Sequence, residues 1–154
     1  MNTHTFHVQV TWNSDRKGLI CSPEVNEQTL NSHSCLEVAT PPQFPKGMAG
    51  IWSPEHLYTA AVGSCLMTTF LAIAENSRLD FLSFSCDTEG VMEQVDGKWL
   101  MTHVHLTPTV EVKTVPDLDR AHKVLMKSEA NCLISNSIKA KVTMQPKVLI
   151  AVPS

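Results

Sequence analysis

The sequence lacks several features that would point to common functions. Basic residues are not in excess, because 12 Lys and Arg stand against 15 Asp and Glu, for a formal net charge of -3. Nucleic-acid-binding domains typically carry a basic patch, so nucleic acid is not an expected partner. The first ten residues hold neither a basic segment nor an apolar run, so we expect no secretory signal and a cytoplasmic location.

Motifs for metals, nucleotides and acyl transfer are also missing. No two cysteines are spaced as a C-x-x-C pair, and no Cys and His residues have the spacing of a structural zinc site. There is no phosphate-binding glycine loop and no G-x-S-x-G motif. His103 and His105 share one face of a predicted strand, but their polar neighbours are typical of a solvated face. We therefore expect neither a metal nor a bound cofactor.

The bulk composition is that of one globular domain. The chain has 154 residues, of which 43% are hydrophobic and 18% are charged. A chain of this length buries enough apolar surface to fold by itself. We expect a single domain over residues 1–154.

The most apolar stretch predicts a central helix. Ser53 is a good N-cap and Pro54 a good first helical residue, and the pattern continues to about Asn76. Residues 57–74 include no charged side chain, and apolar or small residues occupy every face of the helix. A helix that is apolar all round is expected to be buried.

A membrane span is the alternative for this stretch. Its 18 uncharged residues just reach the length that crosses a bilayer. The stretch also holds three threonines, a serine and a glycine, and the rest of the chain needs a core helix. We therefore expect a core helix and no membrane partner.

Strand patterns flank this helix. Residues 5–12 alternate apolar and polar side chains, which is typical of a half-buried strand, and residues 19–21 supply the returning arm of a hairpin. Asp96-Gly97 is a strong hairpin signal between residues 80–95 and 98–113.

A second helix and two further strands complete the expected order. Pro116 opens the helix, whose apolar spacing puts Cys132 on the buried face at its C-terminal end. The strands are expected at residues 138–145 and 147–152. This order predicts an α+β fold with antiparallel sheets around long, buried central helices.

The five cysteines differ in their surroundings. Cys21, Cys35 and Cys86 lie in strand-like stretches, where a free cysteine usually fills space. In a reducing cytosol, a disulfide is more often transient and catalytic than structural. Cys65 and Cys132 lie on the inner faces of two helices that must share a core, so they are the stronger candidates for chemistry.

Two charged residues have ordinary explanations when each is taken singly. Arg16 lies in a predicted hairpin turn, where a solvated arginine is common. Glu55 lies in the first turn of the central helix, where a carboxylate opposes the helix dipole.

Taken together, these residues resemble the OsmC/Ohr family of thiol-dependent hydroperoxide reductases. The resemblance is carried by "SPEHLYTAAVGSCLMTTF" and, some seventy residues later, by "NCLISNSI". The family pattern has a Pro-Glu pair, a cysteine ten residues after the Glu, a second cysteine opening a C-P-x-S-N stretch, and an arginine after the first strand. These features fall on Pro54-Glu55, Cys65, Cys132 with Ser135-Asn136, and Arg16. Leu133 stands where the family usually has proline.

The resemblance implies a reaction and a set of partners. A Cys65 thiolate attacks an organic hydroperoxide, and the resulting sulfenic acid condenses with Cys132 to a disulfide. An external dithiol, such as a lipoyl group on a protein, then restores both thiols. The family fold is an intertwined homodimer with its active sites at the subunit boundary.

Physical chemistry adds three expectations. Burial raises a thiol pKa, so Cys65 would need a cation, for which Arg16 is suitable, with Glu55 as the bidentate partner of Arg16. Ten residues of helix separate Glu55 from Cys65 by roughly 15 Å, which favours a site composed from two subunits. Apolar walls favour bulky organic hydroperoxides over hydrogen peroxide, and we expect these walls from Val62, Leu66, Met67 and Phe70 with the loop Pro42 to Met48.

Two other functions fit the same sequence. The apolar helix could line a pocket for a small hydrophobic ligand in a protein that does no chemistry. Alternatively, the cysteines could only sense oxidants in a stress-associated dimer. Thiol reactivity separates the binder from the enzyme, and turnover with a dithiol separates the sensor.

Overall fold

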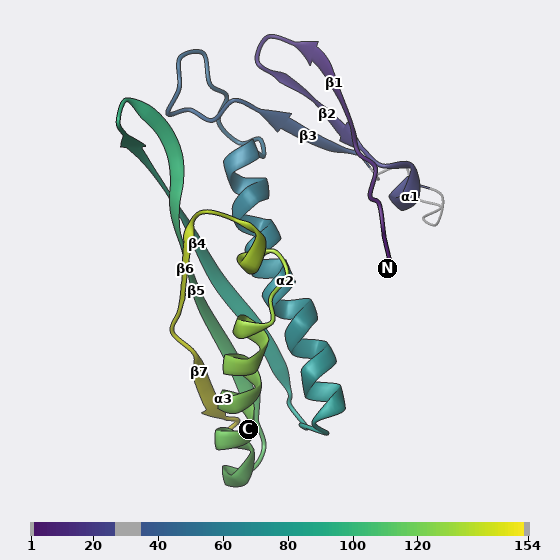
Figure 1. Ribbon diagram of the computed structural model, residues 1–154, viewed down its shortest axis with the longest axis vertical. Coiled ribbons are helices and arrows are strands. Elements are labelled where there is room, and N and C mark those ends of the chain that lie inside the picture. Colours follow the sequence, from purple (N-terminus) through teal and green to yellow (C-terminus); the bar gives the residue numbers. More distant parts are fainter. Residues whose placement is uncertain (1, 27–34, 153–154) are drawn as a thin grey trace. The chain divides into compact units, whose positions relative to one another are not determined.

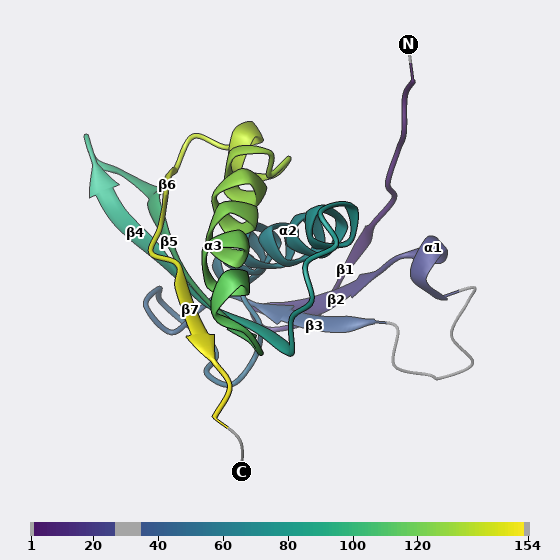
Figure 2. The same ribbon diagram turned by 90° about the horizontal axis from the view of Figure 1, so that it is seen from below.

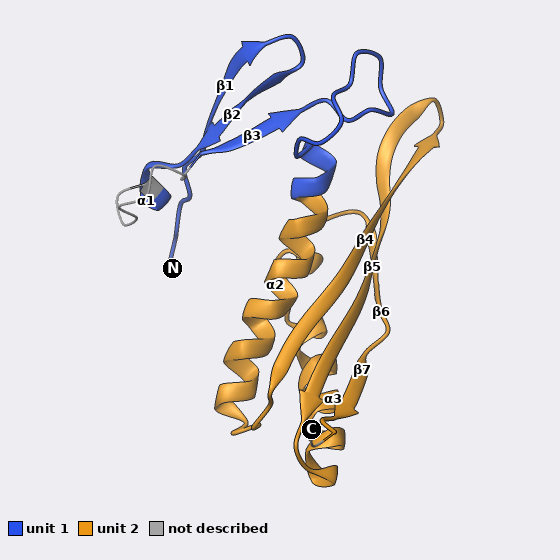
Figure 3. Cartoon of the chain, turned by 180° about the vertical axis from the view of Figure 1, so that it is seen from behind, with its two compact units in different colours: residues 1–57 blue, residues 58–154 orange. Residues whose placement is uncertain are grey.

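The computed structural model describes residues 2–26 and 35–152 and divides into two compact units. Unit 1 comprises residues 1–57, and unit 2 comprises residues 58–154 (Figure 3). Each unit is described by itself.

Unit 1 holds a three-stranded antiparallel sheet (Figure 1). Its strands are β1 (Gln9–Ser14), β2 (Lys17–Cys21) and β3 (Leu36–Ala39), and the short helix α1 (Pro23–Asn26) follows β2. The predicted first hairpin is confirmed. Its turn contains Asp15 at φ 47, in the left-handed region that aspartate tolerates better than most residues.

The prediction that the first strand is half-buried is wrong for the single chain. Every residue of β1 is exposed, and the apolar side chains of the segment, Phe6, Val8, Val10 and Trp12, are 61% to 85% exposed. The alternating pattern is present, but the apolar face it produces is uncovered in this chain. Contiguous exposed apolar surface of this kind usually marks an interaction site.

Unit 2 is built on a long hairpin. Strands β4 (Ser83–Val95) and β5 (Lys98–Val112) pair antiparallel and turn at Asp96-Gly97, as predicted. Both turn residues have positive φ, 50° and 77°, which explains the Asp-Gly signal. On β5 every second residue from Val104 to Val112 is buried.

The rest of unit 2 confirms the α+β class but not a purely antiparallel sheet. Helix α3 (Val115–Ala130) and a 3₁₀ turn (Ser135–Ser137) lead to β6 (Lys141–Met144) and β7 (Lys147–Ile150). Both short strands pair with β5 in parallel. A helix between two neighbouring strands is the usual connection of a parallel pair, and α3 provides it here.

Helix α2 (Pro54–Asn76) begins as predicted, and Ser53 caps it. The Ser53 hydroxyl oxygen accepts the backbone N–H of His56 at 3.2 Å, and its carbonyl accepts the N–H of Leu57. In unit 2, α2 and α3 lie on the same side of the sheet (Figure 2).

The prediction that α2 is buried on every face is wrong for the single chain. One stripe is buried, formed by Val62, Leu66, Phe70 and Ala74 at intervals of four residues. Met67 and Leu71 are 40% and 43% exposed. The helix has the length and hydropathy of a membrane span, which core helices of soluble proteins also have. Its stripe belongs to the core of unit 2, so we interpret it as a core helix with a second apolar face.

Candidate functional site: a thiol pair in unit 2

Cys65 and Cys132 meet at one end of the core of unit 2. They belong to a cluster with Val62, Leu66 and Leu106, in which Cys132 is fully buried and Cys65 half-buried. Both are free thiols and belong to the same core cluster. The predicted burial of Cys132 is confirmed, although it lies two residues beyond the end of α3.

The end of α3 positions Cys132. Asn131 leaves the helical conformation at φ -104, and its side-chain amide donates to the Lys127 carbonyl at 2.7 Å. The Cys132 N–H donates to Glu129, and the Cys132 carbonyl accepts the N–H of Asn136 at 3.0 Å. The chain therefore turns back at once and brings the backbone after Cys132 toward α2.

Hydrogen-bond donors surround the Cys65 sulfur. Burial raises the pKa of the Cys65 thiol, but four donors lower it by more. These donors are the backbone N–H of Ile134, the Cys132 thiol, the Thr69 hydroxyl and the backbone N–H of Leu133. The net result is a pKa below the ordinary value for cysteine, because each donor stabilises the thiolate.

Cys132 is shifted the other way. Burial raises the pKa of its thiol, and the neighbouring Cys65 sulfur raises it further by holding its proton in a hydrogen bond and by charge repulsion. Contacts from Ser135 offset only part of this. The pair is therefore asymmetric: the pKa of Cys65 lies below the ordinary value and that of Cys132 above it, so Cys65 ionises before Cys132.

The expectation that Cys65 needs a cation stays a prediction, but the pKa of Cys65 is already lowered without one. The groups that lower its pKa are neutral donors of unit 2 itself, two of them on the backbone. Sequence reasoning missed these donors, because backbone N–H groups leave no mark in a residue pattern.

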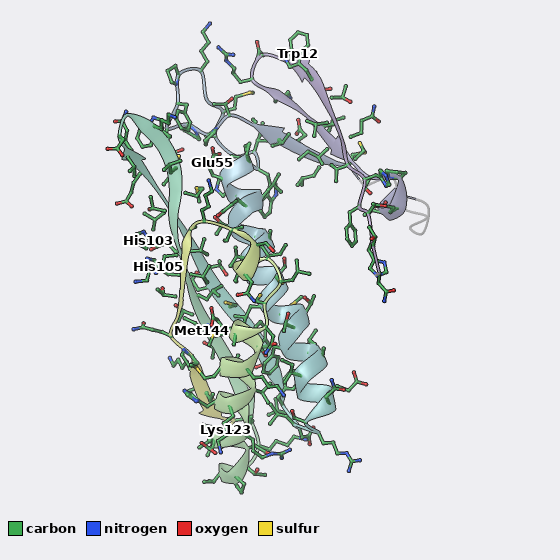
Figure 4. The ribbon with its side chains drawn as sticks, in the orientation of Figure 1. Trp12, Glu55, His103, His105, Lys123 and Met144 are labelled. Atoms are coloured by element: carbon green, nitrogen blue, oxygen red, sulfur yellow. A yellow bond between two sulfur atoms is a disulfide. The ribbon has the colours of Figure 1, made fainter. Side chains whose placement is uncertain are left out.

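The structure places Arg16 and Glu55 in unit 1. They line one pocket of about 490 Å³, whose walls include the apolar side chains of Trp12, Val38 and Phe44. Arg16 is exposed, and Glu55 is half-buried in the first turn of α2 (Figure 4). The expected burial of the arginine is therefore not found in the single chain. The two pairs of candidate residues belong to different units, so their joint action is a prediction.

The expected substrate wall on α2 is largely wrong. Val62, Leu66 and Phe70 are completely buried against the sheet, so they cannot contact a substrate. Only Met67 of that set is exposed. The loop over residues 40–50 does contribute apolar surface, since Pro41 and Phe44 line the pocket beside Arg16.

A disulfide between Cys21 and Cys35 corrects the interpretation of these residues as space-filling thiols. Their Cα atoms lie 4.5 Å apart in unit 1. Strands β2 and β3 pair with Ile20 opposite Leu36, so the next residue outward on each strand is a cysteine. Strand β3 was not predicted, and without it the pairing could not be found.

His103 and His105 lie side by side on β5, with stacked rings 5.8 Å apart (Figure 4). The Nδ1 atoms of the rings hydrogen bond to the hydroxyls of Thr102 and Thr143 respectively. Within residues 2–26 and 35–152, no three or more His, Cys, Asp or Glu residues gather to hold a metal ion. The absence of a metal site stays a prediction for the protein as a whole.

Comparison with known proteins identifies the family. Residues 47–147 match the family described as OsmC-like protein, so the chain belongs to it. A curated relative is the uncharacterized protein YmaD of Bacillus subtilis, 24% identical over 148 residues that cover 94% of this chain and 93% of YmaD.

Solved structures share the fold. An OsmC-like protein of unknown function from Vibrio cholerae has a TM-score of 0.78 at 23% identity, covering 94% of this chain and 99% of its own. An organic hydroperoxide resistance protein from Elizabethkingia anophelis has a TM-score of 0.72 at 17% identity, covering 97% and 99%. These likenesses confirm the predicted α+β class, and the family match confirms the predicted family.

Proposed function

We propose that the protein is a thiol-dependent peroxidase that reduces organic hydroperoxides, and hydrogen peroxide more weakly. The observation that carries this proposal is the asymmetric thiol pair of unit 2. A thiolate in contact with a protonated thiol supplies both the nucleophile and the resolving group that a two-cysteine peroxidase needs. Membership of the OsmC-like family and the likeness in fold to an organic hydroperoxide resistance protein support it.

The reaction divides into three balanced steps. The Cys65 thiolate attacks the terminal oxygen of the hydroperoxide, the O–O bond breaks, and the leaving alkoxide takes a proton to become an alcohol. The Cys65 sulfenic acid then condenses with the Cys132 thiol, which releases water and forms a disulfide. Finally, an external dithiol reduces this disulfide to two thiols and is itself oxidised to a disulfide.

Arg16 and Glu55 complete the proposed site. A guanidinium that stays charged at every working pH can stabilise the negative charge on the departing oxygen, and Glu55 can orient that guanidinium. The pocket that both residues line offers apolar walls for an organic substituent. We propose that the arginine pocket of one subunit meets the thiol pair of its partner.

A homodimer follows from the uncovered apolar surface. The exposed face of β1 and its preceding segment, and the exposed face of α2 with Met67 and Leu71, are both apolar. A second copy would cover them, whereas two such faces in contact with water are unfavourable. A cytoplasmic location and a lipoyl-type protein dithiol as reductant belong to the same proposal.

Peroxide consumption driven by dihydrolipoamide tests the function. We expect turnover with cumene hydroperoxide, a higher kcat/KM for it than for hydrogen peroxide, and no turnover by Cys65→Ser. Cys86→Ser is the matched control, because Cys86 is a half-buried free thiol of the same unit. Equal turnover by wild type and Cys65→Ser would contradict the proposal.

The two alternatives give different results in the same assay. The pocket of about 490 Å³ with apolar walls is the observation that favours a ligand-binding protein. Such a binder would not consume peroxide, and its Cys65 would react slowly with alkylating agents. A redox sensor would consume one equivalent of peroxide per chain and then stop, even with dithiol present.

A further inference from the structure

Lys46 stands at a backbone position that favours glycine. It lies in the loop between β3 and α2, within unit 1 (Figure 3), in a four-residue turn that the Gly47 N–H closes by donating to the Phe44 carbonyl at 3.0 Å. Pro45 and Lys46 are the two central residues of this turn, and Lys46 has φ 63. A turn with proline first and a positive φ second usually takes glycine or asparagine at the second position, because other side chains are strained there.

Backbone hydrogen bonds hold this loop against Arg16. The Thr40 N–H donates to the Arg16 carbonyl at 3.1 Å, and the Met48 N–H donates to the Thr40 carbonyl at 2.8 Å. These bonds close the loop at its base and tie it to the turn between β1 and β2. The backbone therefore sets the position of Lys46, and closing the loop does not explain the choice of a lysine.

The Lys46 side chain lines a cavity of about 530 Å³ together with Asp15, Arg16 and Met48. Asp15 and Arg16 also line the pocket of about 490 Å³ that has apolar walls, so the two cavities adjoin. Asp15, like Lys46, has a positive φ, of 47°. Two residues in a backbone region that side chains rarely adopt therefore border one cavity, and such residues tend to gather at functional sites.

The cations of this cavity are not neutralised by ion pairs of the chain. Across residues 2–26 and 35–152, no ion pair includes Arg16 or Lys46, whereas the neighbouring Lys17 is paired with Glu37 at 3.2 Å. Asp15 offsets one of the two cations, which leaves one positive charge at the cavity. A single carboxylate would neutralise that charge, and the adjoining apolar pocket would take the rest of such a molecule.

We propose that Lys46, with Arg16, forms a binding subsite for the carboxylate of an organic acid whose apolar part occupies the pocket lined by Trp12 and Phe44. Lys46 is then the residue that distinguishes an anionic ligand from a neutral one of the same shape. The proposal goes beyond the proposed function and does not rest on it, because binding at this subsite needs neither thiol of unit 2.

Octanoate and octanol test the subsite, because they match in chain length and differ in charge. The Kd of each is measured by isothermal titration calorimetry at pH 7 for the full chain as wild type, Lys46→Gly and Arg78→Gly. Arg78→Gly is the matched control, since Arg78 is an exposed cation of unit 2 that also has a positive φ, of 51°.

We expect the Kd for octanoate to be about fivefold higher in Lys46→Gly than in wild type or Arg78→Gly, the loss of one partly solvated ion pair. The Kd for octanol should stay within about twofold in all three proteins, because no charge is involved. Raising NaCl from about 50 mM to about 500 mM should weaken octanoate binding by wild type more than by Lys46→Gly. An unchanged Kd for octanoate in Lys46→Gly would overturn the proposal, as would an equal loss for octanol or no binding of octanoate by wild type.

Two further measurements separate binding from a structural role of the lysine. Lys46→Asn is a second neutral variant that tolerates the positive φ, and it should reproduce the result of Lys46→Gly. In urea unfolding, the midpoint of Lys46→Gly should be no lower than that of wild type, because glycine removes the strain at φ 63. A lower midpoint together with weaker binding of both ligands would assign the lysine to the structure of the loop and overturn the proposal. Failure of the proposed function would appear separately, as absent peroxide turnover with octanoate binding intact.

Discussion

The two units of the molecule each hold one pair of cysteines, and the pairs are in opposite states. In unit 1, Cys21 and Cys35 are joined in a disulfide between neighbouring strands. In unit 2, Cys65 and Cys132 touch but are free. The bonded pair is only 14 residues apart in sequence, whereas the free pair joins α2 to the end of α3.

The difference lies in what surrounds the sulfur atoms. The strand register alone brings Cys21 and Cys35 together, and their bond closes a short loop. Burial raises the pKa of Cys65 but hydrogen-bond donors lower it by more, whereas the pKa of Cys132 is raised. A thiolate beside a thiol is prepared to react with an oxidant and then to form a disulfide. We infer that the first pair constrains the chain and the second does the chemistry.

Removing the nucleophile should give the largest effect. Cys65→Ser is expected to lower kcat/KM for cumene hydroperoxide by at least about a thousandfold, because a serine hydroxyl cannot replace a thiolate toward peroxide. Cys35→Ser should stay within about threefold of wild type, since its disulfide has no part in the reaction. Dithiol-driven peroxide consumption measures both. If Cys35→Ser were the more damaging change, the roles assigned to the two pairs would be reversed.

Oxidation should distinguish the pairs by their products. One equivalent of cumene hydroperoxide is expected to remove two thiols per chain, and peptide mapping should find Cys65 joined to Cys132. In Cys132→Ser the reaction should stop at the sulfenic acid, which dimedone traps on Cys65. Recovery of both thiols in the wild-type protein after peroxide treatment would refute the mechanism.

The contrast between the pairs also shows what the sequence could predict. Helical spacing predicts both Cys65 and Cys132 on inner faces; the burial of Cys132 is confirmed, but it follows the end of α3 rather than lying on it. The Cys21–Cys35 bond depends on the register between β2 and β3, which no local signal announced. The lowered pKa of Cys65 depends in part on backbone donors, and a backbone donor has no residue type.

Burial was the property that sequence patterns predicted least well. The apolar face of β1 and the second apolar face of α2, with Met67 and Leu71, are present as predicted, yet both are exposed in the single chain. An apolar pattern says that a face avoids water, but it does not say whether the same chain or a second copy covers it. The prediction that α2 is buried on every face did not distinguish a face covered by the same chain from a face covered by a second copy.

Breaking the disulfide of unit 1 should affect stability. The Cys21→Ser/Cys35→Ser double variant is expected to lose about 3 kcal/mol of unfolding free energy, the value for a closed loop of about 15 residues. Urea unfolding measures this loss, and wild type treated with dithiothreitol should behave like the variant. Cys86→Ser is the control. An unchanged midpoint in the double variant would show that the disulfide does not constrain the fold.

The smallest expected effect is a difference in alkylation rate between Cys65 and Cys86, two half-buried free thiols of unit 2. Hydrogen-bond donors outweigh burial to hold the pKa of Cys65 below its ordinary value, whereas burial raises the pKa of Cys86, which has only the Thr88 hydroxyl and the Thr107 backbone to offset it. The alkylation rate of Cys65 should therefore fall only at a pH below that of an ordinary cysteine, and that of Cys86 should rise only at a higher pH. A thiolate of lower pKa is also less nucleophilic, so the advantage of Cys65 at pH 7 is expected to be about tenfold rather than the full ratio of thiolate fractions.

Iodoacetamide labelling from pH 5 to 10, measured on the two peptides of the same sample, gives both curves. Coincident curves would mean that the donors around Cys65 do not set its ionisation, and the distinction between a reactive and an inert thiol in unit 2 would be lost.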